Sequence, residues 1–319
     1  MEWPSNKIVS VVIATCGKND YLKSCLNSLK NQTQPVFETI VIDNSLNSNF
    51  SRAINERYPD IKLHSSPKNL FYCEALNKGI KMSKGDFILC LNDDVVLDKG
   101  FITEAIRGFL FGPKIGMVSG KILRSDGKTI DSAGLFLTPW RTAKERGYGL
   151  KDKGQYEKEE YIFGVNGAVA FYRREMLEAI KVGYDYFDTD YHFFYEDLDI
   201  AWRAKRFGWK GYYIPGAVAY HVRGGSVRSV SGINKPYARR YLNTNLQLDL
   251  LKNRYLTLIK NDSYLSFLLH LPFILSYDIL VWVYILFLKP NLIKKFLLNL
   301  KYLKSAFQKR KLIEKLGYV

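Results

Sequence analysis

Two glycine-rich loops that commonly hold phosphate are missing from the 319-residue sequence. Neither G-x-G-x-x-G nor G-x-x-x-x-G-K-[ST] follows the first β-branched run, which ends in Ala14-Thr15-Cys16-Gly17. A Rossmann dinucleotide site and a P-loop are therefore disfavoured. Any nucleoside diphosphate bound by this chain would need a metal ion to neutralise its charge.

Cysteine is scarce, and no two cysteines form a C-x-x-C pair. They lie within apolar or helical patterns, at Cys16, Cys25, Cys73 and Cys90. This placement is typical of buried thiols in a reducing compartment. Residues 1–4 lead almost directly into a strand pattern, which leaves no room for a secretory signal. We therefore expect a cytoplasmic protein.

Acidic residues are the minority: 47 lysines and arginines stand against 31 aspartates and glutamates, a net charge of +16. The basic excess lies mostly beyond Leu288, where Glu314 is the single acid. Charge gathered in a tail argues against a nucleic-acid groove, so we expect no nucleic-acid partner. It favours an anionic membrane surface instead.

Short β-branched runs alternate with helical patterns in the first third of the chain, as in the βαβ units of a parallel sheet. The predicted strands cover 8–13, 39–42, 61–64, 87–91 and 115–118, and the predicted helices 21–30, 51–57, 72–82 and 101–111. Further along, the patterns predict loops and short strands over 120–149, helices over 174–180, 196–207 and 237–260, and a strand over 211–214 that Pro215 ends. Ligands of such sheets bind at the carboxyl ends of the strands.

Asn92-Asp93-Asp94 directly follows one of these strands. Two carboxylates at a strand end suit Mg²⁺ or Mn²⁺, with phosphate oxygens completing the shell of the metal. Asn and Asp are also common in solvated turns, so a turn is the alternative. The missing phosphate loop favours the metal site.

Thr15 and Asp43 end the first two strands and face the same edge of the predicted sheet. An acid at the position of Asp43 can accept hydrogen bonds from a ribose or from the edge of a base. A helix N-cap or an ordinary loop acid is the alternative.

Glu196-Asp197 follows the aromatic cluster 191–195 and begins a predicted helix. Acids in a first helical turn are stabilised by the helix dipole, so capping is one interpretation. General-base catalysis is the other, because an apolar surround raises the pKa of a carboxyl toward the working pH. This segment alone does not separate the two.

His221 follows the strand-like run 217–220 and precedes a glycine-rich bend. A lone histidine is usually structural, but delivery by a strand to such a bend favours a ligand site. Arg223 and Arg228 flank the bend, where guanidinium groups can clamp a diphosphate. Ordinary surface charge is the alternative for both.

Together these motifs resemble glycosyltransferase family 2, above all its rhamnosyltransferase-like members. The resemblance extends over about 7–260 and rests on motifs that stand in the family's order: Val11-Val12-Ile13-Ala14-Thr15, Val41-Ile42-Asp43-Asn44-Ser45, Asn69-Leu70-Phe71 with Asn77-Lys78-Gly79-Ile80, Asn92-Asp93-Asp94, Glu196-Asp197-Leu198-Asp199 and His221 to Ser226. It implies the GT-A fold, an α/β fold whose Rossmann-like sheet is mostly parallel and flanked by helices.

The resemblance also implies a reaction and roles for residues. Asp94 and His221 would contact a divalent metal, Mg²⁺ or Mn²⁺, while Asp197 would be the catalytic base. Glu196 would lie near the acceptor, and Asn92 stands where a strict D-x-D motif has its first acid. The nucleotide-sugar would be bound by Thr15, Asp43, Asn69, Asn77, Asp93 and Arg228. The implied reaction is inverting transfer, with dTDP-rhamnose as the suggested donor and a glycan or lipid-linked acceptor, in the synthesis of cell-surface polysaccharide or glycoconjugate.

Three regions follow: a nucleotide-sugar-binding half over 1–120, an acceptor-binding half over 121–235, and a C-terminal helical, basic amphipathic region over 236–319. The stretch 264–288 is nearly long enough to span a bilayer, but Pro272 and Asp278 are costly in an exposed spanning helix. We favour an interfacial or core-packed helix there.

Beyond that stretch, apolar residues recur at helical spacing beside lysines, which predicts a basic amphipathic helix. We expect it to place the protein peripherally on the inner face of the cell membrane; packing on the catalytic domain is the alternative. The composition also leaves open a sugar-phosphate nucleotidyltransferase, or a non-catalytic membrane-associated binding or scaffold protein on the same fold. The first would need the missing phosphate loop, and intact Asp94, Asp197 and His221 argue against the second.

Overall fold

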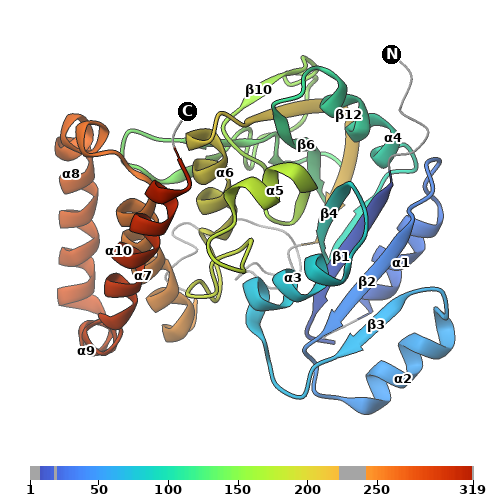
Figure 1. The fold of residues 1–319 in the computed structure, drawn as a ribbon, viewed down its shortest axis with the longest axis horizontal. Helices are drawn as coiled ribbons and strands as arrows, with labels where there is room; N and C mark the ends of the chain where they lie inside the picture. Colours follow the sequence, from blue (N-terminus) through green and yellow to red (C-terminus); the bar gives the residue numbers. More distant parts are fainter. Residues whose placement is uncertain (1–7, 18–19, 223–241, 318–319) are drawn as a thin grey trace.

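The computed structural model describes residues 8–17, 20–222 and 242–317, and Figure 1 shows them as a central sheet flanked by helices. The strands of the sheet are β1 (Val9–Thr15), β2 (Glu38–Asp43), β3 (Lys62–Ser65), β4 (Phe87–Asn92), β5 (Val95–Leu97), β6 (Ile115–Arg124), β7 (Ile130–Ser132), β10 (Glu160–Ile162), β11 (Val169–Arg173) and β12 (Lys210–His221). They are arranged in the order β10-β12-β6-β11-β4-β1-β2-β3, with β5 beside β12 and β7 beside β6. A separate hairpin pairs β8 (Leu135–Leu137) with β9 (Ala143–Glu145).

Helices cover both faces of the sheet. One face is covered by α1 (Tyr21–Lys30), α2 (Ser48–Arg57) and α4 (Phe101–Leu110), and the other by α3 (Phe71–Met82), α5 (Arg174–Ile180) and α6 (Glu196–Arg206). Successive side chains of a strand point to opposite faces of the sheet, so the sheet has a hydrophobic core on each face. Val11 and Ile13 of β1 pack into the core with α1, whereas Val12 packs into the core with α3. The predicted α/β fold with a sheet covered on both faces is confirmed.

The sheet is parallel from β3 to β4, and β11 is antiparallel to both β4 and β6. In this register Thr15 lies opposite Asp43, and Asp43 lies opposite Ser65. Asn92 lies opposite Ala14, one residue earlier on β1. The strand ends singled out in the sequence therefore meet at one edge of the sheet, which is the edge where ligands of such folds bind.

One predicted strand boundary is wrong, because β12 does not end at Pro215. It continues to His221 through a register shift between Ile214 and Val218, and the irregularity at Pro215-Gly216 accommodates the proline. On the neighbouring strand, a Cβ at Gly120 would lie 2.0 Å from the backbone oxygen of Ala217. The close approach of the two backbones at this bulge requires glycine.

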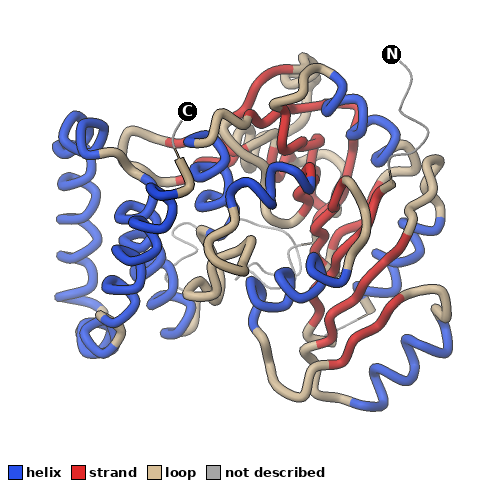
Figure 2. Tube along the Cα trace, viewed as in Figure 1, coloured by secondary structure: helices blue, strands red, loops and turns tan. Residues whose placement is uncertain are grey.

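Four helices form the C-terminal end of the chain: α7 (Thr244–Asn261), α8 (Tyr264–Leu288), α9 (Asn291–Leu298) and α10 (Lys301–Lys315). Apart from connecting loops, the left side of Figure 2 consists of helices. The single amphipathic helix predicted beyond 288 is wrong, because the chain turns at Asn299-Leu300 and forms α9 and α10 as two helices. Among the cysteines, Cys25, Cys73 and Cys90 are buried as predicted, but Cys16 is exposed.

Helix α8 is not a core helix, although its apolar composition allowed that prediction. Ile274 and Ile285 are its buried residues, and most of its leucines face outward. The polar residues that interrupt the apolar stretch face the protein: Asp278 pairs with Arg254 of α7 at 2.6 Å. Within the described residues, α8 is the one helix long and apolar enough to cross a membrane, as judged by length and composition.

Candidate active site

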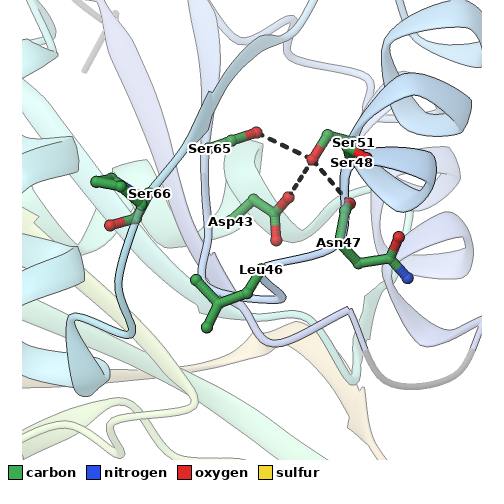
Figure 3. A pocket seen from close by; sticks show the side chains of 8 residues that line it. Asp43, Leu46, Asn47, Ser48, Ser51, Ser65 and Ser66 are labelled. Atoms are coloured by element: carbon green, nitrogen blue, oxygen red, sulfur yellow. Dashed lines mark hydrogen bonds between the residues drawn. The ribbon is translucent and has the colours of Figure 1, made fainter.

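A pocket of about 350 Å³ opens at the carboxyl ends of β2 and β3 (Figure 3). Asp43 lies within it and is held from two sides: Ser45 N donates to Oδ1 at 2.7 Å, and Ser51 Oγ donates to Oδ2 at 2.6 Å. The remaining lining residues are Leu46, Asn47, Ser48, Ser65, Ser66 and Pro67. Small polar side chains around a fixed carboxylate suit the hydroxyl and amide groups of a nucleoside.

Thr15 and Asp93 contact each other between β1 and β4. Thr15 Oγ1 donates to Asp93 Oδ2 at 2.5 Å and accepts from Gly17 N at 3.1 Å. Burial raises the pKa of Asp93 to about 6, and the negative charge of Asp94 adds to this rise while the Thr15 hydrogen bond opposes it. The sequence placed both residues at the donor, and the structure brings them into direct contact.

Asp94 and His221 lie close together because β5, which begins directly after Asp94, pairs with the end of β12. In this pairing Val95 lies opposite His221. His221 Nε2 lies 3.2 Å from Asp94 Oδ1, and His221 Nδ1 lies 2.9 Å from Asp131 Oδ2. All three side chains are buried. Burial lowers the pKa of His221, but the hydrogen bonds to Asp131 and Asp94 outweigh it and raise that pKa above its ordinary value.

This arrangement fits the divalent metal that the sequence predicted. Asp131 can hold Nδ1–H and thereby present Nε2 toward Asp94, as carboxylates do behind histidine ligands of metals. Within the described residues no group of three or more His, Cys, Asp or Glu side chains is placed to hold an ion. If a divalent ion binds beside Asp94 and His221, oxygens of a diphosphate would have to complete its shell.

Replacing Asp131 with asparagine tests this role. We expect Asp131→Asn to weaken metal-dependent nucleotide binding by about 10- to 100-fold, because the histidine loses the carboxylate that fixes its tautomer. Titration calorimetry with Mn²⁺ and a nucleoside diphosphate measures the effect. Asp126→Asn is the control, since Asp126 is exposed and bonds the backbone of its own turn. Equal affinities for Asp131→Asn and Asp126→Asn would contradict the assignment.

Glu196 and Asp197 form the first turn of α6, after two residues with left-handed backbone, Phe194 at φ 71° and Tyr195 at φ 72°. Asp197 accepts from Leu198 N at 2.7 Å and from Gly167 N at 3.3 Å. Glu196 Oε2 is shielded from solvent and has no hydrogen-bond partner within the described residues. A structural role at the start of the helix therefore explains the hydrogen bonds of Asp197. It does not explain why the Glu196 carboxyl is buried with an oxygen that has no partner among the described residues.

The two acids have different surroundings. Burial, reinforced by the charge of Asp197, raises the pKa of Glu196 from 4.5 to about 8. Two backbone N–H donors stabilise the carboxylate of Asp197. At neutral pH Glu196 is therefore protonated, and its carboxyl lies beside that of Asp197 in the first turn of α6.

The raised pKa of Glu196 makes stability depend on pH. Between pH 4.5 and about 8 this carboxyl is ionised in the unfolded chain and protonated in the folded one, so it destabilises the fold as the pH rises. We expect Glu196→Gln to raise the melting temperature over that of the wild type by a margin that grows from pH 5 to pH 8. The control is Glu175→Gln, an exposed glutamate of α5. A margin that stays constant with pH would count against the shift.

Tyr72 of α3 joins the edge of the sheet to the acid pair. Its hydroxyl lies 2.9 Å from Asn92 Oδ1 and 2.9 Å from Gly167 O, and Gly167 N bonds Asp197. A Cβ at Gly167 would lie 3.3 Å from Glu196 Oε1, so glycine lets the backbone approach the acids. A short chain of contacts therefore runs from the end of β4 to the start of α6.

Other predicted site residues have different surroundings. Asn69 is exposed, and its side chain accepts from Phe71 N at 2.8 Å. The amide of Asn77 bonds the backbone of Tyr186 and Phe187, which ties α3 to that loop. Arg228, with Arg223 and the bend at 224–226, lies outside the described residues.

The sequence did not indicate Tyr72, Asp131 or Gly167. Tyr72 follows the Asn69-Leu70-Phe71 motif directly, which is a signal that could have singled it out. Asp131 and His221 lie 90 positions apart, and no pattern in the region 120–149 marks that acid. Only the pairing of β7 with β6, and of β6 with β12, brings them together.

Transfer of a sugar from a nucleoside diphosphate requires one place that holds the nucleotide and another that removes a proton from the acceptor. A polar pocket and a pair of acids lie at this edge of the sheet, and the fold is that of the GT-A class of glycosyltransferases. Residues 10–181 match the family model "Glycosyl transferase family 2". Because the match covers more than half of the 319 residues, the chain belongs to glycosyl transferase family 2. Its activity is glycosyl transfer in the synthesis of polysaccharide or another glycan.

Two curated relatives illustrate the range of this family. The chain is 23% identical to the poly-beta-1,6-N-acetyl-D-glucosamine synthase of Staphylococcus epidermidis over 94% of this chain and 68% of the relative. It is 24% identical to the N-acetylglucosaminyl-diphospho-decaprenol L-rhamnosyltransferase of Mycobacterium tuberculosis (strain CDC 1551 / Oshkosh) over 67% of this chain and 76% of the relative. The predicted resemblance to family members that include a rhamnosyltransferase is confirmed.

Solved structures agree on the fold. The crystal structure of GalNAc-T7 with UDP, GalNAc and Mn²⁺ superposes with a TM-score of 0.56 at 13% identity, and covers 80% of this chain and 51% of that one. S. aureus TarS 1-349 in complex with UDP gives a TM-score of 0.52 at 14% identity, over 80% of this chain and 67% of that one. The chain thus spans about half the length of GalNAc-T7. Similarity at this level of identity establishes the GT-A architecture alone.

Proposed function

We propose that this chain is an inverting glycosyltransferase that transfers a sugar from a nucleotide-sugar to a glycan or lipid-linked acceptor. One observation carries the proposal: Tyr72 and Gly167 join the donor side at Asn92 to the carboxylate of Asp197. A base in that position lies close to the place where the diphosphate and sugar of a bound donor would end.

In this mechanism Asp197 takes the proton from the acceptor hydroxyl, and the acceptor oxygen bonds to the anomeric carbon of the sugar. The bond between that carbon and the nucleoside diphosphate breaks, and the diphosphate leaves with the bonding electrons. Because the oxygen attacks opposite the leaving group, the anomeric configuration inverts. Glu196, protonated at neutral pH, donates a hydrogen bond near the acceptor and leaves Asp197 as the base.

Asp94 and His221 would hold a Mg²⁺ or Mn²⁺ ion, which when bound neutralises the diphosphate of the donor. Asp43 and its pocket would bind the nucleoside, and Thr15 with Asp93 lies between the nucleoside and the diphosphate. Arg228 is proposed as a further contact of the diphosphate. Asn69 and Asn77 act on this pocket indirectly, because their side chains fix the start of α3 and the loop at 186–187.

For the donor we propose dTDP-rhamnose, with the rhamnosyl transfer named for the mycobacterial relative as support. The staphylococcal relative is named for a polymer of N-acetyl-D-glucosamine, so UDP-N-acetylglucosamine is the donor to compare. The test is nucleoside diphosphate release from a panel of nucleotide-sugars, in Mg²⁺ and in Mn²⁺, with and without lipid-linked acceptors. No release of nucleoside diphosphate from any donor of the panel would overturn the proposed activity. Release only from a donor other than dTDP-rhamnose would overturn the choice of sugar.

We also propose that α8 docks the enzyme on the inner face of the cell membrane without crossing it. Its outward stripe is apolar and strongly exposed, and includes Leu265 (71%), Leu269 (66%), Leu280 (71%) and Phe287 (75%). Its inner side is fixed by polar contacts, with Trp282 Nε1 donating to Tyr255 OH at 2.7 Å and Asp278 paired with Arg254. These contacts hold the inner side of α8 against α7, so the exposed apolar stripe is the surface available to the membrane interface. Exposed lysines on α9 and α10 add attraction to anionic lipid.

Charged substitutions on the outward stripe test this docking. We expect the double variant Leu269→Glu, Leu280→Glu to lose at least about 10-fold in binding to vesicles that contain anionic lipid, because two apolar side chains no longer enter the interface. Flotation of vesicles with the protein measures the effect. Leu150→Glu is the control, since Leu150 is 53% exposed and lies outside the C-terminal helices. Unchanged flotation of the double variant would refute docking through α8.

A further inference from the structure

The loop that leads into the acid pair has no regular secondary structure and is held by α7. Residues 188–195 form turns and bends between α5 and α6. Polar residues of α7 contact this loop at successive helical turns: His192 lies 3.4 Å from Asp249, Lys252 Nζ donates to Asp190 O, and Tyr191 OH lies 2.9 Å from Thr257 Oγ1. Side chains three or four residues apart share one face of a helix, so α7 presents a polar stripe to the loop.

Asn253 lies in the middle of that stripe and holds the residues just before the acids. Its Nδ2 donates to Phe193 O at 2.7 Å and to Phe194 O at 2.9 Å. The side chain is fully buried, while its Oδ1 has no hydrogen-bond partner within the described residues. This amide therefore ties α7 to two successive carbonyls of the loop, directly before the acid pair.

The backbone that Asn253 holds is in an unfavourable conformation. Phe194 and Tyr195 both have left-handed φ angles, which L-residues with bulky side chains rarely adopt. Two such residues in succession persist only where surrounding contacts determine them, and they concentrate at functional sites. The turn they form sets the direction from which Glu196 and Asp197 enter the site.

We propose that Asn253 is a positioning residue for the catalytic acids: its amide fixes the left-handed turn from which Glu196 and Asp197 project. This inference rests on the proposed function, because it gives Asn253 the role of orienting Asp197, the proposed base. It also gives α7 a part in catalysis, although α7 lies after the sheet in the sequence and contributes no side chain to the donor pocket.

The test is Asn253→Ala, measured for kcat, for the dissociation constant of the nucleoside diphosphate, and for melting temperature. We expect kcat to fall by about 10- to 100-fold, because a small displacement of a catalytic group costs that much rate. The dissociation constant should stay within about twofold, since the nucleoside pocket lies on β2, β3 and α2. If the alanine variant is insoluble, Asn253→Ser replaces it; its hydroxyl can still donate one hydrogen bond and should give an intermediate kcat.

Asn261→Ala is the matched control. Asn261 is an equally buried amide on the same helix. When the Asn261 side chain is removed, its partner Asp199 still pairs with Lys260 and Arg203. We expect a similar loss of melting temperature, with kcat within about threefold of the wild type. A kcat for Asn261→Ala as low as that of Asn253→Ala would overturn the specific role of Asn253.

A second variant separates positioning from general destabilisation. Phe194→Gly removes the backbone strain at one of the two left-handed residues, because glycine adopts left-handed φ angles freely. Adding Asn253→Ala to Phe194→Gly should therefore reduce kcat less than it does in the wild type. Equal reductions in both backgrounds, or parallel losses of kcat and nucleotide affinity, would overturn the inference. A wild-type chain that transfers no sugar would overturn the proposed function and this inference together, whereas an active wild type with an equally active Asn253→Ala variant would overturn the inference alone.

Discussion

Asp197→Asn should abolish sugar transfer, with a loss of about 1,000-fold or more, and should leave the binding of nucleoside diphosphate unchanged. General-base catalysis contributes about 10²- to 10⁴-fold, and an amide cannot take a proton from the acceptor. The substitution keeps the size of the side chain, so α6 should still begin at Glu196. Steady-state release of nucleoside diphosphate measures transfer, and titration calorimetry measures binding.

Glu196→Gln is the matched comparison for that result. Glu196 already holds a proton at neutral pH, because burial raises its pKa to about 8. A glutamine in its place therefore resembles the native state, and we expect a loss of rate no larger than about 10-fold. A near-wild-type rate for Asp197→Asn would remove Asp197 from the role of base, and a large loss confined to Glu196→Gln would transfer that role to Glu196.

Asp94→Ala should weaken the binding of nucleoside diphosphate in Mn²⁺ by about 100-fold, and should change binding in the absence of metal much less. Asp94 is one of the two metal ligands proposed above, and its carboxylate would bear the charge that attracts the ion. Without Asp94, His221 also loses one of the two acids that orient it. Calorimetric titrations with and without Mn²⁺ measure both effects.

The control for this second result is Asp98→Ala. Asp98 lies four residues further along the chain, directly after β5; it is exposed and accepts a hydrogen bond from the backbone N–H of Gly100. Its loss should leave metal-dependent binding unchanged, which would show that the effect of Asp94 is local. Equal affinities of the Asp94→Ala variant with and without metal, both close to those of the wild type, would contradict a metal site at Asp94 and His221.

The elements of the fold were predictable where local periodicity was strong. The helices over 21–30 and 174–180 match α1 and α5, because apolar residues recur there at helical spacing between clear breaks. The prediction failed where a distant partner decides the outcome. Pro215 ends a strand in isolation, but the bulge against Gly120 lets β12 continue past it.

The site divides in the same way. The places of Thr15, Asp43 and Asp94 at one edge of the sheet were predictable, because Thr15 and Asp43 end buried strands, Asp94 follows another, and strand ends of a parallel sheet meet at one edge. Asp131 and Asn253 were not, because each acts through a partner at least 60 positions away in the chain. Only strand pairing or helix packing creates those contacts. The boundary placed between 235 and 236 remains a prediction, but the contacts of α7 favour counting α7 with the catalytic part.

The buried polar stripe on α7 also limits how this enzyme can be recombined. A hybrid that takes its sheet from this chain and its C-terminal helices from a relative would keep the contacts of the loop at 188–195 only if the crossover lies beyond Asn261. A crossover near 236 would pair the loop at 188–195 with a foreign helix that lacks matching donors. Exchange of the exposed apolar surface is therefore feasible from α8 onward, whereas α7 must be kept together with the sheet.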